Sequence, residues 1–302
     1  MSEAVLLPAV APAPSGSESP LRLSWRRFSH DRFAVAAGAV VLLFVLMAIF
    51  APWIAPQDPN ETDLLRRLQP PVWLEGGDWN YLLGCDALGR DLLSRIIYGS
   101  RISIFIGAAV ILIATGIGIV TGLAAGYFRG WVDSVISRIV DILLAFPYLL
   151  FAIGLMAMMG PGLHNIIVAL AYKEWVIPCR LVRGETLVLR DIEYIEAARA
   201  AGASPIYIVL REILPNILSP VIVVSTIRMA HVIILEASLS FLGIGVQPPT
   251  PSWGSLVADG RGFIWDAWWI STFSGLAILL LVLAINVASQ GLRDAFDPRL
   301  QD

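Results

Sequence analysis

The chain has 302 residues and a formal net charge of −3; 57% of its residues are hydrophobic and only 15% are charged. Together with a mean hydropathy of +0.74, this composition excludes an ordinary soluble domain and predicts an all-α polytopic membrane protein. The 21 basic residues include a single lysine, Lys173, which follows Tyr172. The sequence therefore lacks the Gly-Lys-Ser/Thr loop with which many proteins bind ATP.

The N-terminal part of the chain predicts a tail followed by a membrane anchor. Residues 1–32 are rich in proline, alanine and serine and carry several arginines. Residues 33–54 form an apolar run behind this polar leader. A cleaved signal peptide is the alternative, but the length of the leader favours a retained first transmembrane helix.

Residues 55–100 are expected to form an extracytoplasmic loop, because they are rich in proline and too polar for lipid. Near its end, Asp86 with Arg90 and Asp91 with Arg95 have the i,i+4 spacing of ion pairs on a helix. This spacing predicts a packed helix that precedes the next transmembrane segment.

Residues 101–290 are expected to form a core of five further transmembrane helices. Gly118, Gly122 and Gly126 recur at every fourth position and predict close packing of the first of these helices against a neighbour. Asp141 and Pro147 predict a kinked, protein-facing helix for the second. The five spans are expected at about 102–125, 139–159, 164–181, 217–242 and 272–288.

Arginine placement predicts the orientation of these six spans. With the N-terminus inside, thirteen arginines fall in inner segments and six in outer loops. This distribution follows the positive-inside rule, so both termini, including the tail 291–302, are expected to be cytoplasmic.

A polar interruption within the cytoplasmic loop 183–216 predicts a knob of two short helices. Asp191 is expected to cap the first helix, and Gly202 to end it in a left-handed turn. Ser204 and Pro205 have the residue types that begin a second helix, and Pro215 is expected to close it.

The second helix of the knob predicts docking onto another protein. Its apolar residues follow the spacing of one amphipathic face: Ile206, Val209, Leu210 and Ile213. A DNA-binding helix-turn-helix is disfavoured, because its second helix would present polar side chains to base edges. A merely structural cytoplasmic hairpin is the other alternative.

The span at 217–242 carries three ionisable residues, Arg228, His231 and Glu236, within about 140° of arc. Such groups in a spanning helix line a polar pathway or satisfy partners on neighbouring helices, and the sequence leaves both alternatives open. The three histidines are far apart and match no metal-ligand spacing, so no metal site is expected. No nucleophile with its base is visible, so no enzymatic activity is expected in this chain.

Several motifs together resemble the permeases of ABC importers. Glu196, Ala197, Ala198, Gly202, Leu214 and Pro215 match their EAA signature. The runs LGCDALGRDLLSRIIYGSRIS, EASLSFLGIGVQPPTPSWG and GLRDAFDPRL resemble the C-type permease of dipeptide, oligopeptide, glutathione and nickel importers. Two positions depart from the family pattern: Cys85 stands where threonine is common, and Glu212 where peptide permeases often have histidine.

The resemblance implies a type I ABC importer permease in the bacterial plasma (inner) membrane. By this resemblance, the EAA residues form a coupling helix that docks onto a separate ATPase. A B-type second permease, two ATP-binding subunits and an extracytoplasmic solute-binding protein are the implied partners. This chain is expected to hold no cofactor, because ATP and Mg²⁺ are bound by the ATPases.

The implied substrate is a short peptide, with nickel chelates, glutathione and opines as alternatives. A non-transporting membrane scaffold or receptor subunit is the alternative of a different class. The resemblance and the ionisable residues of the span at 217–242 favour transport.

Overall fold

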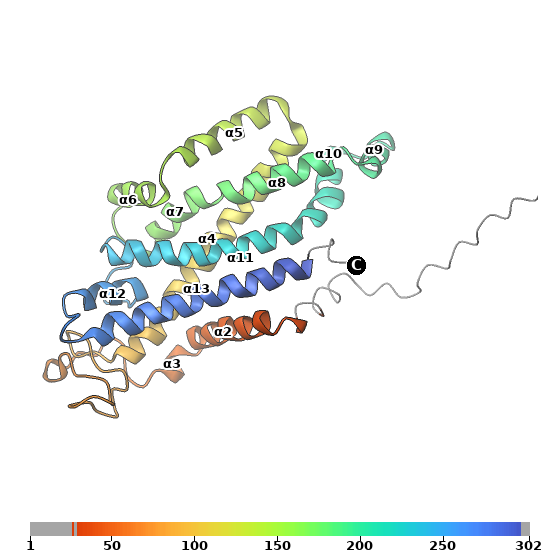
Figure 1. Ribbon diagram of the computed structural model, residues 1–302. Helices are drawn as coiled ribbons and strands as arrows, with labels where there is room; N and C mark the ends of the chain where they lie inside the picture. Colours follow the sequence, from red (N-terminus) through yellow and green to blue (C-terminus); the bar gives the residue numbers. More distant parts are fainter. Residues whose placement is uncertain (1–25, 27–28, 297–302) are drawn as a thin grey trace, which may run out of the picture.

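The computed structural model describes residue 26 and residues 29–296. Within this part of the chain the regular elements are helices, accompanied by one isolated bridge between Cys85 and Asp91. In Figure 1, α2, α11 and α13 lie side by side while α4 crosses them obliquely. The helices of this bundle and its surroundings are α2 (Arg32–Ile49), α3 (Ala51–Ile54), η1 (Leu64–Arg66), α4 (Leu92–Phe128), α5 (Gly130–Ala145), α6 (Tyr148–Met159), α7 (Leu163–Glu174), α8 (Val176–Leu189), α9 (Glu193–Ala200), α10 (Pro205–Tyr207), η2 (Ile208–Ile213), α11 (Leu214–Phe241), α12 (Trp253–Arg261) and α13 (Trp268–Phe296).

Four helical stretches in the described part of the chain are long and apolar enough to cross a membrane. They are α2, α4, the stretch Pro205–Phe241 and α13. The bent pair of α5 and α6 adds a fifth if it crosses as one span. The expected span at 164–181 consists of α7 and α8, which meet at Trp175. An all-helical membrane protein is confirmed, and the count of six spans stays a prediction.

The kink expected at Pro147 is a sharp break. The axes of α5 and α6 meet at 92°. Phe146 has an extended backbone, with φ −88° and ψ 135°, because a following proline disfavours the helical conformation. Asp141 on α5 is exposed rather than protein-facing within this chain.

The boundaries of two long helices differ from those expected. Helix α4 begins at Leu92, within the expected loop 55–100, and α13 continues to Phe296, within the expected tail 291–302. The expected tail 1–32 lies almost entirely outside the described residues.

Buried charges hold the residues before α4 in place. Asp86 and Arg90 form the expected ion pair, with 2.7 Å between Oδ2 and Nε, but in a turn rather than on a helix. The expected pair of Asp91 with Arg95 is wrong, because Asp91 caps α4 by accepting a hydrogen bond of 2.8 Å from the backbone N–H of Ser94. Arg95 instead faces Asp86, with 3.3 Å between Nη1 and Oδ2.

Three glycines bring α4 and α8 into close contact, as their spacing predicts. A methyl group added at any of the three would lie less than 3.0 Å from atoms of α8, so the two backbones approach at these positions. The glycines that form this seam are Gly118, Gly122 and Gly126. Small residues are required there for steric reasons.

The replacement Gly122→Ala tests this seam. The new Cβ would lie 2.7 Å from the carbonyl oxygen of Cys179 and from Cβ of Val182. We expect the free energy of unfolding in detergent to fall by about 1–3 kcal/mol, the usual cost of overpacking. Gly116→Ala is the matched control, because nothing lies within 4 Å of its added methyl group, and alanine favours a helix over glycine by about 1 kcal/mol. Equal stabilities of the two variants would contradict the close packing.

Candidate functional site

A cluster of charged side chains joins α11 to the end of α7. Arg228 donates two hydrogen bonds to the carboxylate of Glu174, one of them with 3.0 Å between Nη2 and Oε2. The same Nη2 lies 3.0 Å from Nδ1 of His231, which accepts because a guanidinium only donates. The side chain of Glu174 is 1% exposed, whereas that of His231 is 40% exposed. The cluster therefore has a buried anion at its base and a polar face that this chain leaves open.

Lys173 stabilises the break between α5 and α6. Its amine donates a hydrogen bond to the carbonyl of Phe146, the residue that ends α5. The amine also lies 5.3 Å from the centre of the Tyr148 ring, whose hydroxyl donates to the carbonyl of Leu170 at 2.7 Å. Lys173 and Glu174 are both buried, but they take different partners.

Glu236 lies apart from this cluster. Its carboxylate is fully buried and accepts hydrogen bonds from Ser103 on α4, at 3.0 Å, and from Ser240 on α11, at 2.8 Å. These contacts support the alternative in which Glu236 binds a polar partner on a neighbouring helix instead of lining a pathway. The structure thus brings together two of the three residues considered for a pathway, Arg228 and His231.

The pairing of Glu174 with Arg228 could not be predicted from spacing, because the two residues are far apart in the chain. The one available signal was a carboxylate within an apolar segment, which requires a buried partner. Within the described residues, His, Cys, Asp and Glu side chains do not form a group able to hold a metal ion.

The knob comprises residues 191–213 and lies at one end of the bundle, opposite the loop of residues 55–91 (Figure 1). Gly202 has φ +84°, the left-handed conformation expected of it. Its N–H donates to the carbonyl of Arg199, and the N–H of Ala203 donates to that of Ala198, at 3.0 and 3.1 Å. These two bonds end α9 in a Schellman motif. Ser204 caps the next helix by accepting from the N–H of Tyr207, as predicted.

The expected cap by Asp191 is wrong. Helix α9 begins after Ile192 without a side-chain cap, and Asp191 instead pairs with Arg129 and Arg190, at 2.7 and 3.1 Å. Partial desolvation acts to raise the pKa of Asp191, but the two guanidinium groups outweigh it and hold that pKa below its usual value. Asp191 thereby ties the base of the knob to the end of α4.

The knob has a buried and an exposed apolar side. Ile195, Ile208 and Ile213 are fully buried in one core. Ile206 and Leu210 are 70% and 52% exposed. The four residues expected on one face are therefore divided, because the π-helical winding of η2 changes the periodicity that an α-helix would have. The exposed side is apolar and accessible for docking.

The helix expected to close at Pro215 instead continues. The N–H of Leu214 bonds to the carbonyl of Val209, five residues earlier, and α11 then begins with proline in its first turn. Because η2 precedes it without a break, Pro215 leaves a helical hydrogen bond unmade, and the π-helical turn before it is where the hydrogen-bond spacing changes. The helical stretch Pro205–Phe241 thus carries both part of the knob and the cluster residues Arg228 and His231.

The six residues that match the EAA signature lie in α9, in the turn that follows it and at the start of α11. Most of them are exposed, and two are half-buried. The exposed ones are Glu196, Ala197, Gly202 and Pro215, and the half-buried ones are Ala198 and Leu214. Their role in docking an ATPase stays a prediction.

Two family models match the chain. The model described as the binding-protein-dependent transport system inner membrane component matches residues 118–302. The N-terminal TM domain of oligopeptide transport permease C matches residues 19–71.

Curated relatives match nearly the whole chain. The di/tripeptide transport system permease protein DppC of Pseudomonas aeruginosa is 44% identical over 94% of both chains. The glutathione transport system permease protein GsiD of Pectobacterium atrosepticum is 44% identical over 94% of this chain and 92% of its own length. DppC of Escherichia coli is 44% identical over 96% of both chains.

A solved structure shares the fold. It is an inward-facing conformation of the MetNI methionine ABC transporter, which matches with a TM-score of 0.56 at 20% identity, over 68% of this chain and 98% of that one. The expected ABC importer permease fold is thereby confirmed. By its family models and relatives, the chain belongs to the family of inner membrane components of binding-protein-dependent transport systems.

Proposed function

We propose that the chain forms half of the translocation pathway of an ATP-driven importer and is coupled to a separate ATPase through the knob. The observation that carries this proposal is the helical stretch Pro205–Phe241. It joins an exposed apolar knob to a charged cluster with an open polar face. Movement of the knob would displace the cluster directly, as in rigid-body alternating access.

The rest of the assembly follows from this proposal. A second, B-type permease would cover the open face of the cluster and complete the pathway. Two ATPase subunits would bind and hydrolyse ATP with Mg²⁺, and a solute-binding protein would deliver the solute to the end opposite the knob. The arginine distribution supports a cytoplasmic knob and cytoplasmic termini.

Short peptides are the proposed substrate class. The relatives named for di/tripeptide, dipeptide and glutathione transport support this choice. Arg228, which Glu174 holds beside the partly exposed His231, offers a donor-rich guanidinium that suits the backbone carbonyls and the carboxylate terminus of a peptide. Glu236 would contact a solute only if α4 and α11 separated, since it is buried between them.

Uptake into vesicles that contain the complete complex tests the substrate. We expect ATP-dependent accumulation of labelled di- and tripeptides, which an excess of unlabelled peptide abolishes and an excess of a nickel chelate or an opine does not. Competition by glutathione, itself a tripeptide, is compatible with the proposal. Accumulation of a nickel chelate without peptide uptake would contradict it, and ATP hydrolysis without flux of any of these solutes would favour a scaffold.

The knob is tested by Ile206→Asp, because Ile206 is 70% exposed and its replacement leaves the core intact. A charge at the centre of an apolar interface usually costs enough to lower binding by about tenfold or more. We expect peptide uptake to fall by about that factor, together with co-purification of the ATPase. Leu65→Asp, at the opposite end and 98% exposed, is the control for ATPase binding and is expected to leave co-purification of the ATPase unchanged. Equal effects of the two variants would remove the support for a docking knob.

The charged cluster is tested by Arg228→Gln, Glu174→Gln and their combination. Removing one partner of a buried ion pair leaves an uncompensated charge and costs about 3–5 kcal/mol, whereas the double variant avoids this cost. We therefore expect the double variant to recover thermal stability relative to either single variant.

If the cluster lines the pathway, peptide uptake and thermal stability should respond differently to the double variant. We expect the double variant to remain defective in peptide uptake although its stability recovers, because the solute loses the guanidinium of Arg228. Recovery of uptake together with stability would show that the pair only holds α7 against α11, and would contradict the pathway role.

A further inference from the structure

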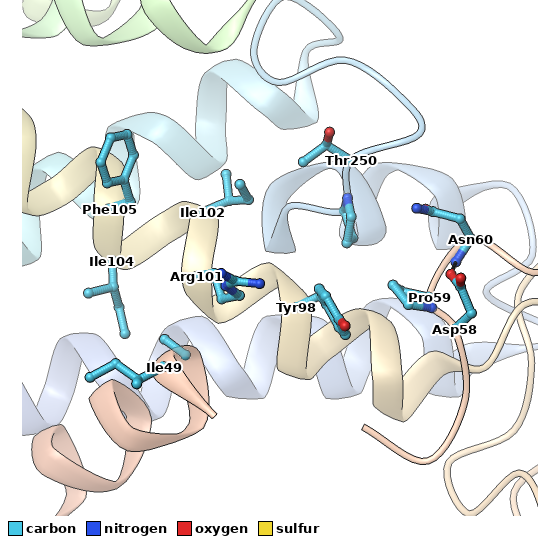
Figure 2. Close-up of a pocket in the computed structure, with 12 residues that line it drawn as sticks. Ile49, Asp58, Pro59, Asn60, Tyr98, Arg101, Ile102, Ile104, Phe105 and Thr250 are labelled. Carbon is cyan, nitrogen blue, oxygen red and sulfur yellow. Dashed lines mark hydrogen bonds between the residues drawn. The ribbon is translucent and has the colours of Figure 1, made fainter. Parts of the chain in front are cut away.

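A cavity lies where α2 ends beside α4, at the end of the bundle opposite the knob. Its volume is about 690 Å³. Four segments enclose it: the end of α2, the start of α4, the loop 58–60 and the segment 250–251 (Figure 2). None of its lining residues belongs to the charged cluster or to the knob.

The cavity is apolar on one side and polar on the other. Figure 2 shows Ile49, Ile104 and Phe105 toward one side, and Asp58 with Asn60 toward the other. Arg101 lies between the two groups. A molecule that fits this cavity must itself be amphipathic.

Two opposite charges line the cavity without pairing. Within residues 29–296, neither Arg101 nor Asp58 forms a salt bridge, and both are exposed. The guanidinium of Arg101 lies over the ring of Tyr98 at 5.8 Å, and one carboxylate oxygen of Asp58 accepts from the N–H of Asn60 at 2.8 Å. One cationic and one anionic group thus remain available to a ligand.

The cavity lies at the level of a membrane interface. Ile49 is the last residue of the apolar helix α2, and the exposed Trp53 follows one turn later. Tryptophan is enriched at the boundary between hydrocarbon and water. Helix α4 has 37 residues and is about 55 Å long, so it extends beyond a hydrocarbon core of about 30 Å. Arg101 lies in the part of α4 that reaches this boundary.

We propose that this cavity binds a phospholipid whose headgroup carries both a phosphate and a primary ammonium, as phosphatidylethanolamine does. Arg101 and the hydroxyl of Tyr98 bind the phosphate, Asp58 binds the ammonium, and the acyl chains follow Ile49 and Phe105 into the bilayer. A choline headgroup fits less well, because its quaternary ammonium cannot donate a hydrogen bond to Asp58. The proposal does not depend on which solute crosses the membrane or on which leaflet holds the lipid.

Native mass spectrometry of the complete complex tests this site, after exchange into nanodiscs of equimolar phosphatidylethanolamine and phosphatidylcholine. We expect the native complex to retain the ethanolamine lipid about tenfold over the choline lipid, the difference that one charge-assisted hydrogen bond supports. Arg101→Gln should lose retention of both lipids. Asp58→Asn should retain both lipids without the preference.

Arg261→Gln is the matched control. Arg261 stacks on Phe241 at 5.5 Å much as Arg101 does on Tyr98, but it does not line the cavity. We expect it to keep the lipid and the preference. Equal retention of the two lipids by the native complex, or unchanged retention in Arg101→Gln, would overturn the proposal. So would absence of retained lipid, which would indicate that the second permease covers the cavity.

Free phosphoethanolamine separates a lipid site from a site for soluble phosphate. Added at millimolar concentration, it should not displace the retained lipid, because it lacks the acyl chains that contact Ile49 and Phe105. Complete displacement would assign the site to the soluble compound and would contradict a lipid-binding cavity.

Discussion

Helical continuity from Pro205 to Phe241 is the constraint on which the functional interpretation depends. A helical stretch that runs without a loop through η2 and α11 places the second half of the knob and the charged cluster on one element. Pro215 does not interrupt it, because η2 ends at Ile213 and α11 begins at Leu214 with no loop between them, and Pro220 lies within α11 without ending it. No loop lies between the second half of the knob and Arg228. We therefore expect a displacement of the knob to be transmitted to Arg228 through the helix.

Packing around this element restricts how it can move. The glycine seam fixes α8 against α4, and the hydrogen bond from Ser103 to Glu236 fixes α11 against α4 at another point. The pair of Arg228 with Glu174 then joins α11 to α7. In a low-dielectric interior these polar contacts are costly to break, so α4, α7, α8 and α11 are expected to move as a unit. The exposed cluster face and the exposed knob are the surfaces at which we expect this unit to meet its partners.

Local patterns predicted local structure well. The glycine spacing identified the α4 seam, and the residue types around Gly202 identified the turn, because each depends on backbone geometry within a few residues. Sequence predictions failed where a contact comes from a distant segment. Asp191 forms an ion pair with Arg129 instead of capping a helix, and Arg228 binds Glu174 on another helix. The prediction that Pro215 ends a helix was wrong for a local reason. The periodicity of apolar residues does not reveal the π-helical segment that precedes Pro215.

The most direct test of the account is the distance between two spin labels on this single element, at Arg211→Cys in the knob and Ile234→Cys beyond the cluster. Both positions are exposed, and the native Cys85 and Cys179 are buried, so labelling is selective. The expected separation is about 35 Å for a continuous helix. In the complete complex, we expect this distance to stay unchanged between the nucleotide-free and ATP-bound states while uptake proceeds. A clear shortening on ATP binding would show that the helix bends between knob and cluster, and would contradict direct transmission.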